Sequence, residues 1–151
     1  MNRAARAIAT LGGAGYARYA PGTVGSILAL PFAWLLAWSG GRFVLLLAGI
    51  AALAVGAWAS ELYVAQTKTF DPKECVIDEL AGQWIACAFA PVSFTGFALA
   101  FVLFRLFDIW KPWPVRQAEH LHGGLGVMAD DVVAALMAGA VLVALGHLTL
   151  I

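Results

Sequence analysis

Acidic residues in this chain gather in three short stretches, and each stretch adjoins a long apolar run. Of the nine Asp and Glu residues, seven lie in these places: Asp71, Glu74, Asp78 and Glu79 in DPKECVIDEL, Asp108 in FRLFDIWKPWP, and the adjacent pair Asp130 and Asp131. Carboxylates at the edge of apolar segments need a partner, and Mg²⁺ is the first candidate because it is a hard cation that prefers oxygen ligands. The pattern therefore predicts a shared magnesium site.

Helix capping is the alternative explanation for some of these acids. Asp71, Pro72 and Glu74 form the pattern of an N-cap, a first-turn proline and a returning capping carboxylate, which predicts a helix that starts there. A last helix that begins near Asp131 could likewise be capped by one of the two adjacent aspartates. Capping does not explain Asp78, because it lies four residues after Glu74 on the same helical face, where like charges repel.

Groups that could bind an anion also occur. In YAPGTVGS, Gly22 follows a proline in a turn, and Thr23 and Ser26 stand at the start of an apolar helix whose free N–H groups would point the same way. Lys111 lies three residues after Asp108, between prolines and tryptophans. The alternatives are an ordinary cap by Thr23 and a lysine that snorkels at the membrane edge. Further basic candidates for a phosphate are Arg18 and Arg105.

The composition indicates a membrane protein. Of the 151 residues, 62% are hydrophobic, and four stretches carry no charge: 24–41, 43–60, 80–104 and 132–151. As helices these would be roughly 26 to 38 Å long, which overlaps the ~30 Å hydrocarbon core. We therefore expect an all-α, compact, multi-helical integral membrane protein with about two to four membrane-embedded segments. Residues 1–151 should form a single domain without a cleaved signal peptide.

Charge and cysteine content indicate which partners and which redox compartment fit the protein. The net charge is zero and the nine basic residues form no patch, which argues against nucleic acid as a partner. Cys75 and Cys87 indicate no disulfide framework and fit a reducing cytoplasmic face.

The stretch 80–104 constrains the topology. If it crossed the membrane once, Asp108 would lie on the opposite side from Asp78, and no shared site could form. We therefore expect it to be re-entrant or broken near Pro91, because each arm of about 12 residues is too short to span. All basic residues except Arg42 then share one side, which the positive-inside tendency assigns to the cytoplasm. This predicts a multi-pass protein of the cell (inner) membrane with a cytoplasmic active site.

Four blocks of the sequence resemble the phosphatidylglycerophosphatase A family. They are APGTVGS, DPKECVIDELAG, FRLFDIWKPWP and GGLGVMADDVVAAL, in the family's order and over about residues 10–140. The resemblance implies a Mg²⁺-dependent phosphatase of phospholipid biosynthesis that hydrolyses phosphatidylglycerophosphate to phosphatidylglycerol and phosphate. The family's acidic positions and its lysine fall on Glu74, Asp78, Glu79, Asp108, Asp130, Asp131 and Lys111, all retained.

The sequence indicates part of the catalytic mechanism. The chain has no Cys-x5-Arg loop, no Asp-x-Asp pair and no suitably placed histidine nucleophile, so no residue is an obvious carrier of a covalent intermediate. We expect in-line attack by a water bound to Mg²⁺, with Lys111, Glu79 and Asp108 as catalytic residues and Asp108 as the proton acceptor. The expected ligands are Glu74, Asp78, Asp130 and Asp131. His120 and His122 should be solvated loop residues.

Two other classes remain as alternatives. A divalent-cation transporter or channel subunit would also gather carboxylates, although it would normally place some within its spans, and the four apolar runs here carry none. A non-catalytic membrane scaffold would explain the hydrophobicity and leave the clustered acids unexplained.

Overall fold

The described chain is built from helices. The computed structural model describes residues 2–69 and 72–148, and in this part it contains no strand. The elements are α1 (Arg3–Ala9), the 3-10 helix η1 (Leu11–Tyr16), α2 (Pro21–Thr67), α3 (Ile77–Ala88), α4 (Phe94–Trp110), α5 (Val115–Ala118) and α6 (Gly123–His147). The prediction of an all-α protein is confirmed.

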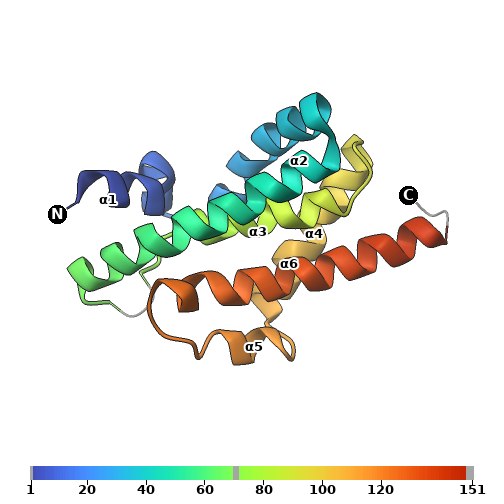
Figure 1. Ribbon diagram of the computed structural model, residues 1–151. Helices are drawn as coiled ribbons and strands as arrows, with labels where there is room; N and C mark the ends of the chain where they lie inside the picture. The colour runs from blue at the N-terminus through green and yellow to red at the C-terminus, as the bar shows by residue number, and fades with distance from the viewer. Residues whose placement is uncertain (1, 70–71, 149–151) are drawn as a thin grey trace.

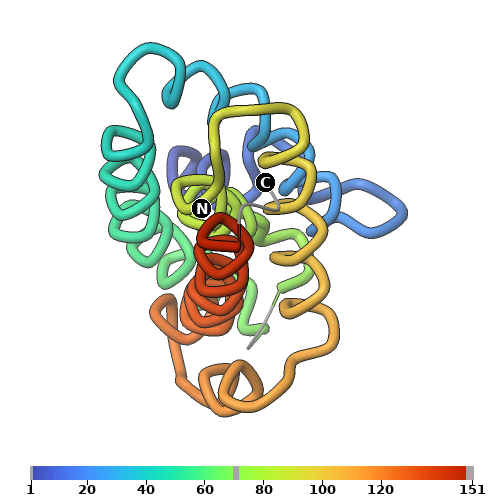
Figure 2. The backbone as a smooth tube through the Cα atoms, turned by 90° about the vertical axis from the view of Figure 1, so that its right-hand side faces the viewer, coloured from blue at the N-terminus to red at the C-terminus, as the bar shows by residue number. Residues whose placement is uncertain are grey.

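The helix α2 consists of two arms that fold back on one another. The backbone of Gly41 has φ 78° and ψ 175°, a conformation that glycine adopts without a steric penalty, and the chain reverses direction there (Figures 1 and 2). The apolar stretches 24–41 and 43–60 are thus the two arms. The exposed Arg42 lies at the turn between them. Pro31 lies inside the first arm without ending it.

The apolar stretch 80–104 is broken near Pro91, as predicted. The helix α3 ends at Ala88 and α4 begins at Phe94, where the Ser93 hydroxyl accepts a hydrogen bond from the Gly96 N–H at 3.0 Å. At 1.5 Å per residue α3 is about 18 Å long and α4 about 26 Å. The two helices form a hairpin, so the beginning of α3 and the end of α4 lie at the same end of the molecule (Figure 1).

Two predicted helix starts were wrong. The helix α3 begins at Ile77, five residues after the proline that was expected to open it. The reason is tertiary: the Val76 N–H donates to the Ala9 carbonyl at 2.8 Å, which ties the residue before α3 to the end of α1, and residues 72–75 form a turn instead of a helix. Asp71 lies outside the described residues. The last helix starts at Gly123, so Asp131 lies more than two turns inside it and caps nothing.

Small residues in α3 allow the central helices to approach closely. A Cβ atom on Gly82 would lie 2.7 Å from the ring of Phe104 in α4 and 3.2 Å from the carbonyl oxygen of Asp131 in α6. The absence of a side chain at Gly82 therefore lets the backbones of α3 and α6 approach closely and leaves room for the ring of Phe104 from α4, as is common where small residues face a helix interface in membranes. This contact sets the separation of the three helices that carry the acidic residues.

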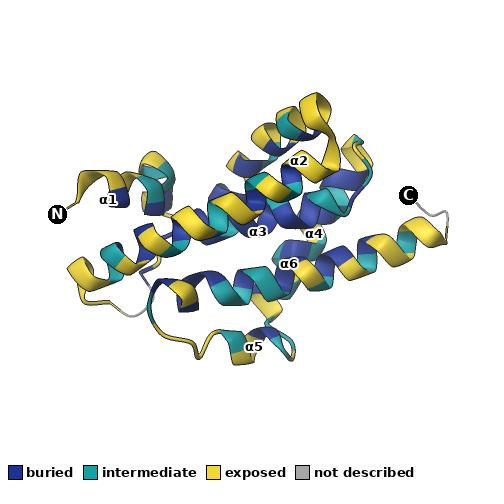
Figure 3. Cartoon of the chain, viewed as in Figure 1, coloured by how far each residue is buried: buried dark blue, intermediate teal, exposed yellow. Residues whose placement is uncertain are grey.

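The outer surface is apolar. The helices α2 and α6 are long and apolar enough to cross a membrane. Large side chains such as Phe32, Trp38 and Phe43 are exposed on α2, and Figure 3 shows exposed residues along the outside of both helices. Such a surface fits lipid. The two apolar helices and this exposed apolar surface indicate a membrane protein.

Candidate active site

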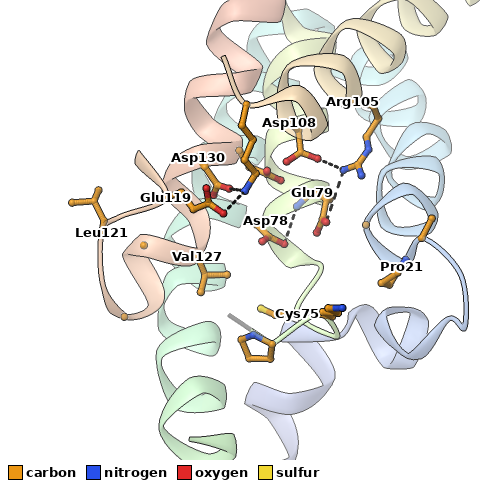
Figure 4. Close-up of a pocket in the computed structure, with 18 residues that line it drawn as sticks. Pro21, Cys75, Asp78, Glu79, Arg105, Asp108, Glu119, Leu121, Val127 and Asp130 are labelled. Atoms are coloured by element: carbon orange, nitrogen blue, oxygen red, sulfur yellow. Dashed lines mark hydrogen bonds and ion pairs between the residues drawn. The ribbon is translucent and has the colours of Figure 1, made fainter. Parts of the chain in front are cut away.

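Charged side chains from three helices converge on one pocket. It has a volume of about 370 Å³ and lies where α3 begins, α4 ends and α6 completes its second turn, beside the start of α2 (Figure 4). The predicted site residues that line it are Gly22, Asp78, Glu79, Arg105, Asp108, Lys111, Asp130 and Asp131. Segments more than 100 residues apart in sequence thus supply a single site.

The carboxylates form two groups that share one member. Oxygen atoms of Asp78, Glu79 and Asp131 lie within 4.8 Å of one another, and so do those of Asp108, Asp130 and Asp131. Asp131 is 3% exposed. Its Oδ2 atom and the Oε2 atom of Glu79 are buried and have no hydrogen-bond partner among the described residues. Asp131 is therefore the central residue of the cluster.

The charge of this cluster is incompletely balanced by the protein. Burial, together with the neighbouring carboxyl of Glu79, raises the pKa of Asp78 well above its usual range, and burial also raises the pKa of Glu79. Two buried oxygens that have no donor in the described part of the chain, those of Glu79 and Asp131, lie among carboxylates that are grouped in threes, and carboxylate oxygens are the ligands that Mg²⁺ prefers. The residues present therefore fit a hard divalent cation.

Arg105 lies at the side of the pocket that faces α2. Its guanidinium forms an ion pair with Asp108 and lies 3.9 Å from Glu79 Oε1. It also donates to the Thr23 hydroxyl at 3.5 Å. Arg105 thus links the end of α4 to the beginnings of α3 and α2.

Lys111 extends into the opposite side of the pocket. Its ammonium donates to Asp130 Oδ2 at 2.8 Å and to Glu119 Oε1 at 3.0 Å. Burial by itself lowers the pKa of Lys111, but these two hydrogen bonds raise it above its usual range, so the ammonium stays charged. The snorkelling alternative does not fit a lysine that points into an acidic pocket.

Comparison with known proteins identifies the chain. The sequence profile of a family described as phosphatidylglycerophosphatase A matches residues 7–146. The chain belongs to the phosphatidylglycerophosphatase A family. It is a phosphoric monoester hydrolase.

Relatives of this family member cover most of its length. A phosphatidylglycerophosphatase A of Escherichia coli (strain K12) is 34% identical over 140 residues, which are 89% of this chain and 79% of that protein. One of Haemophilus influenzae is 34% identical over 137 residues, 89% and 84% of the two chains. A candidate phosphatidylinositol-3-phosphatase of Bacteroides thetaiotaomicron is 39% identical over 130 residues, 81% and 80% of the two chains. No solved structure matches.

Four residues predicted from the sequence do not line the pocket. Glu74 lies in the turn before α3, outside both carboxylate groups. Arg18 is exposed and stacks on the ring of Tyr19. Ser26 is buried and its hydroxyl donates to the Gly22 carbonyl at 3.0 Å, within α2. Thr23 does not line the pocket, and its described side-chain contact with a pocket residue is the hydrogen bond that its hydroxyl accepts from Arg105.

Gly22 has a steric role in this family member. A Cβ atom at this position would overlap Oε1 of Glu79 and lie 3.2 Å from Arg105. The absence of a side chain therefore lets the start of α2 pack against these two residues.

Sequence reasoning missed Glu119, which lines the pocket and binds Lys111. It lies eight residues after Lys111 in a polar segment, and neither its spacing nor its neighbours distinguish it from a solvated acid. Glu61, which does not line the pocket, has a structural contact that the sequence did not indicate. It accepts a hydrogen bond from the Gly124 N–H at the start of α6. His120 and His122 are exposed, as predicted.

Proposed function

We propose that this chain is a Mg²⁺-dependent phosphatase that hydrolyses phosphatidylglycerophosphate to phosphatidylglycerol and phosphate, a step of phospholipid biosynthesis. The observation that supports the proposal is the buried group of carboxylates around Asp131, flanked by Lys111 and Arg105 at a membrane-protein pocket. This arrangement has oxygen ligands for a cation and basic groups for a phosphate monoester. The names of the E. coli and H. influenzae relatives support the choice of substrate.

Asp78, Asp130 and Asp131 are the residues that we assign to hold Mg²⁺, with Glu79 and Asp108 beside them. These five residues make up the two carboxylate groups, and within each group the oxygens lie within 4.8 Å of one another. A bound Mg²⁺ would supply positive charge against the phosphoryl oxygens and make water more acidic. Glu74, which the sequence also predicts as a ligand, does not line the pocket and is not part of the assigned set.

The basic residues orient the phosphate. Lys111 acts as a point charge from the side of α6, and Arg105 presents its guanidinium from the side of α2. Both groups can neutralise charge that develops on the phosphoryl oxygens during transfer. They therefore fix the phosphate between the two ends of the pocket.

Asp108 is the carboxylate that we assign to accept a proton from the attacking water. Its ion pair with Arg105 fixes its orientation. The water oxygen bonds to phosphorus while the bond from phosphorus to the glycerol oxygen breaks. The proton of the water passes to Asp108, and the leaving glycerol oxygen takes up a proton from solvent to become the hydroxyl of phosphatidylglycerol. Among the described residues, neither buried cysteine is followed by a Cys-x5-Arg loop, so neither is an obvious carrier of a covalent intermediate. We therefore favour direct displacement by water.

The proposed location is the cell (inner) membrane, with the pocket on the cytoplasmic side. The pocket lies at the end of the molecule to which α4 returns, and the basic residues Lys73, Arg105, Lys111 and Arg116 lie in or next to the segments that form it. The positive-inside tendency assigns this end to the cytoplasm. Arg42 lies at the turn between the arms of α2, away from the pocket.

A phosphate-release assay tests the proposal. Purified protein in mixed micelles should release phosphate from phosphatidylglycerophosphate, EDTA should abolish release, and Mg²⁺ should restore it. Phosphatidylinositol 3-phosphate is the comparison substrate because of the name of the B. thetaiotaomicron relative. Faster release from that lipid would overturn the proposed substrate, and release that survives EDTA would overturn the magnesium requirement. Absence of release from both would favour the transporter or scaffold alternatives.

A further inference from the structure

A second pocket lies between the first arm of α2 and α4. Its volume is about 370 Å³, and all eight residues that line it are apolar, among them Leu30, Pro31 and Trp34 from α2, and Ala98, Phe101 and Val102 from α4. We refer to these six residues as the apolar groove. The ring of Trp34 packs edge-on against Phe97, with centroids 5.3 Å apart, and joins the two helices there.

The apolar groove is aligned with the active site along both helices. On α4, Ala98, Phe101, Arg105 and Asp108 follow one another at separations of three or four residues, so they share one face. On α2, the same spacing leads from Thr23 through Ile27 to Leu30 and Trp34. The hydrogen bond between Arg105 and Thr23 crosses from one face to the other at the polar end. The groove thus lies in line with the active site along both helices, and no described residue lines both pockets.

The distances suit one ligand with a polar and an apolar end. By helical rise, Val102 lies about 4.5 Å and Ala98 about 10 Å along α4 from Arg105. Val102 and Trp34 are both exposed, so the groove is open at its side to the surrounding lipid. A phospholipid could therefore enter from the bilayer with its headgroup toward Arg105.

We propose that the apolar groove binds an acyl chain of the phospholipid substrate while its phosphate occupies the active site. The proposal rests on the proposed lipid phosphatase function. Alignment of the groove with the active site along α2 and α4 favours the substrate as occupant over a bulk bilayer lipid, because the polar end offers Lys111 and Arg105 to a phosphate monoester.

The groove affects how the lipid substrate is positioned more than how tightly it binds. A chain that moves from the bilayer into an apolar groove exchanges one apolar environment for another and gains little hydrophobic free energy. It does restrict how the headgroup enters the pocket, and positioning of this kind acts on catalytic efficiency.

A matched pair of variants tests the groove. Ala98→Phe fills it, whereas Ala54→Phe makes the same change at an exposed position on the second arm of α2. Phosphate release is measured from dioleoyl phosphatidylglycerophosphate and from its dibutanoyl analogue, whose four-carbon chains have far less apolar length to place in the groove. We expect the ratio of kcat/KM for the long-chain to the short-chain substrate to fall about tenfold in Ala98→Phe and to stay at the wild-type value in Ala54→Phe. An unchanged ratio in Ala98→Phe, or an equal fall in both variants, would overturn the proposal.

Photolabelling separates this inference from the proposed function, because it requires no turnover. The probe is a phosphatidic acid with a diazirine in its acyl chain, incorporated into phosphatidylcholine vesicles with the purified protein. Labelled peptides should map to α2 and α4 around Trp34 and Phe101. Excess unlabelled phosphatidic acid should remove this labelling, and Ala98→Phe should lose it. Equal displacement by added phosphatidylcholine, or labelling elsewhere, would show a bulk lipid and overturn the proposal even in an active enzyme.

Discussion

Replacing Lys111 by Met tests whether its charge serves the substrate. The substitution keeps the length of the stem and removes the ammonium that donates to Asp130 at 2.8 Å and Glu119 at 3.0 Å. Lys111 has φ 48°, a left-handed conformation that Met and Lys both adopt at the same cost, so the backbone strain is unchanged. The variant therefore isolates the loss of one positive charge.

The cost to folding should be modest. The Glu119 side chain is 45% exposed, so its ion pair with Lys111 contributes at most about 1 kcal/mol. The Asp130 side chain is 13% exposed, and its hydrogen bond to a charged donor is worth about 1.5 to 3 kcal/mol. We therefore expect a loss of about 1.5 to 4 kcal/mol in the free energy of unfolding, and the thermal unfolding of the purified variant checks that it is folded in the assay.

The cost to catalysis should be larger. Removal of one group that stabilises transition-state charge typically lowers kcat about 10² to 10³-fold, or about 2.7 to 4 kcal/mol. The assay is initial phosphate release across a Mg²⁺ titration. Because the lost charge faces the phosphate, extra Mg²⁺ should not restore Lys111→Met. Lys111→Arg should recover little, since a guanidinium differs in reach and geometry from an ammonium.

The exposed Arg116 offers a matched control, because Arg116→Met removes a positive charge from the neighbouring helix α5, outside the pocket. It should keep wild-type turnover. If high Mg²⁺ restores Lys111→Met to wild-type activity, Lys111 acts on the cation site through Asp130 and does not bind the phosphate, and the reasoning above is refuted.

Three further predictions concern the ligands, the packing of α2 and the topology. Asp131→Asn should lower kcat/KM about 10²-fold, and Asp78→Asn should raise the Mg²⁺ concentration needed for activity. Added Mg²⁺ should partly restore both variants, whereas Glu74→Gln should stay near wild-type activity. A larger loss of activity in Glu74→Gln than in Asp131→Asn across the Mg²⁺ titration would reverse the assignment. Gly22→Ala should displace Glu79 and lower kcat about tenfold or more, while Gly146→Ala, which adds a methyl in open space, should not, as measured by phosphate release. Single cysteines at Thr69, Trp110 and Leu121, in a chain without Cys75 and Cys87, should react with an impermeant thiol reagent from the cytoplasmic side and one at Arg42 from the outside; labelling of Thr69 and Trp110 from opposite sides would exclude the shared site.

Much of the fold was predictable because it depends on composition and on local breaks. The uncharged runs around the two arms of α2 and in α6 indicated apolar helices, since burial of backbone polar groups in lipid requires helices. Pro91, with small and polar residues near it, indicated that 80–104 is interrupted. The demand that Asp78 and Asp108 share a site then implied a hairpin, which the structure contains.

Predictions failed where a distant contact outweighed a local pattern. The Asp-Pro-x-Glu sequence favours a helix start, but the hydrogen bond from Val76 to Ala9 joins this segment to a helix more than 60 residues away and delays α3 to Ile77. Ser26 had the residue type of a pocket donor, but its hydroxyl donates within its own helix. Neither outcome is encoded in the immediate neighbours of these residues.

The sequence by itself determined the class of the protein, the acidic and basic residues available for chemistry and their resemblance to one phosphatase family. Only the tertiary structure decided which of these residues meet. Asp131 lies in both carboxylate groups because Gly82 lets α3 approach α4 and α6, and Lys111 reaches Asp130 across 19 positions of chain because α4 ends beside α6. Hydropathy and capping depend on nearby residues, whereas the position of a charge in a site depends on how whole helices pack.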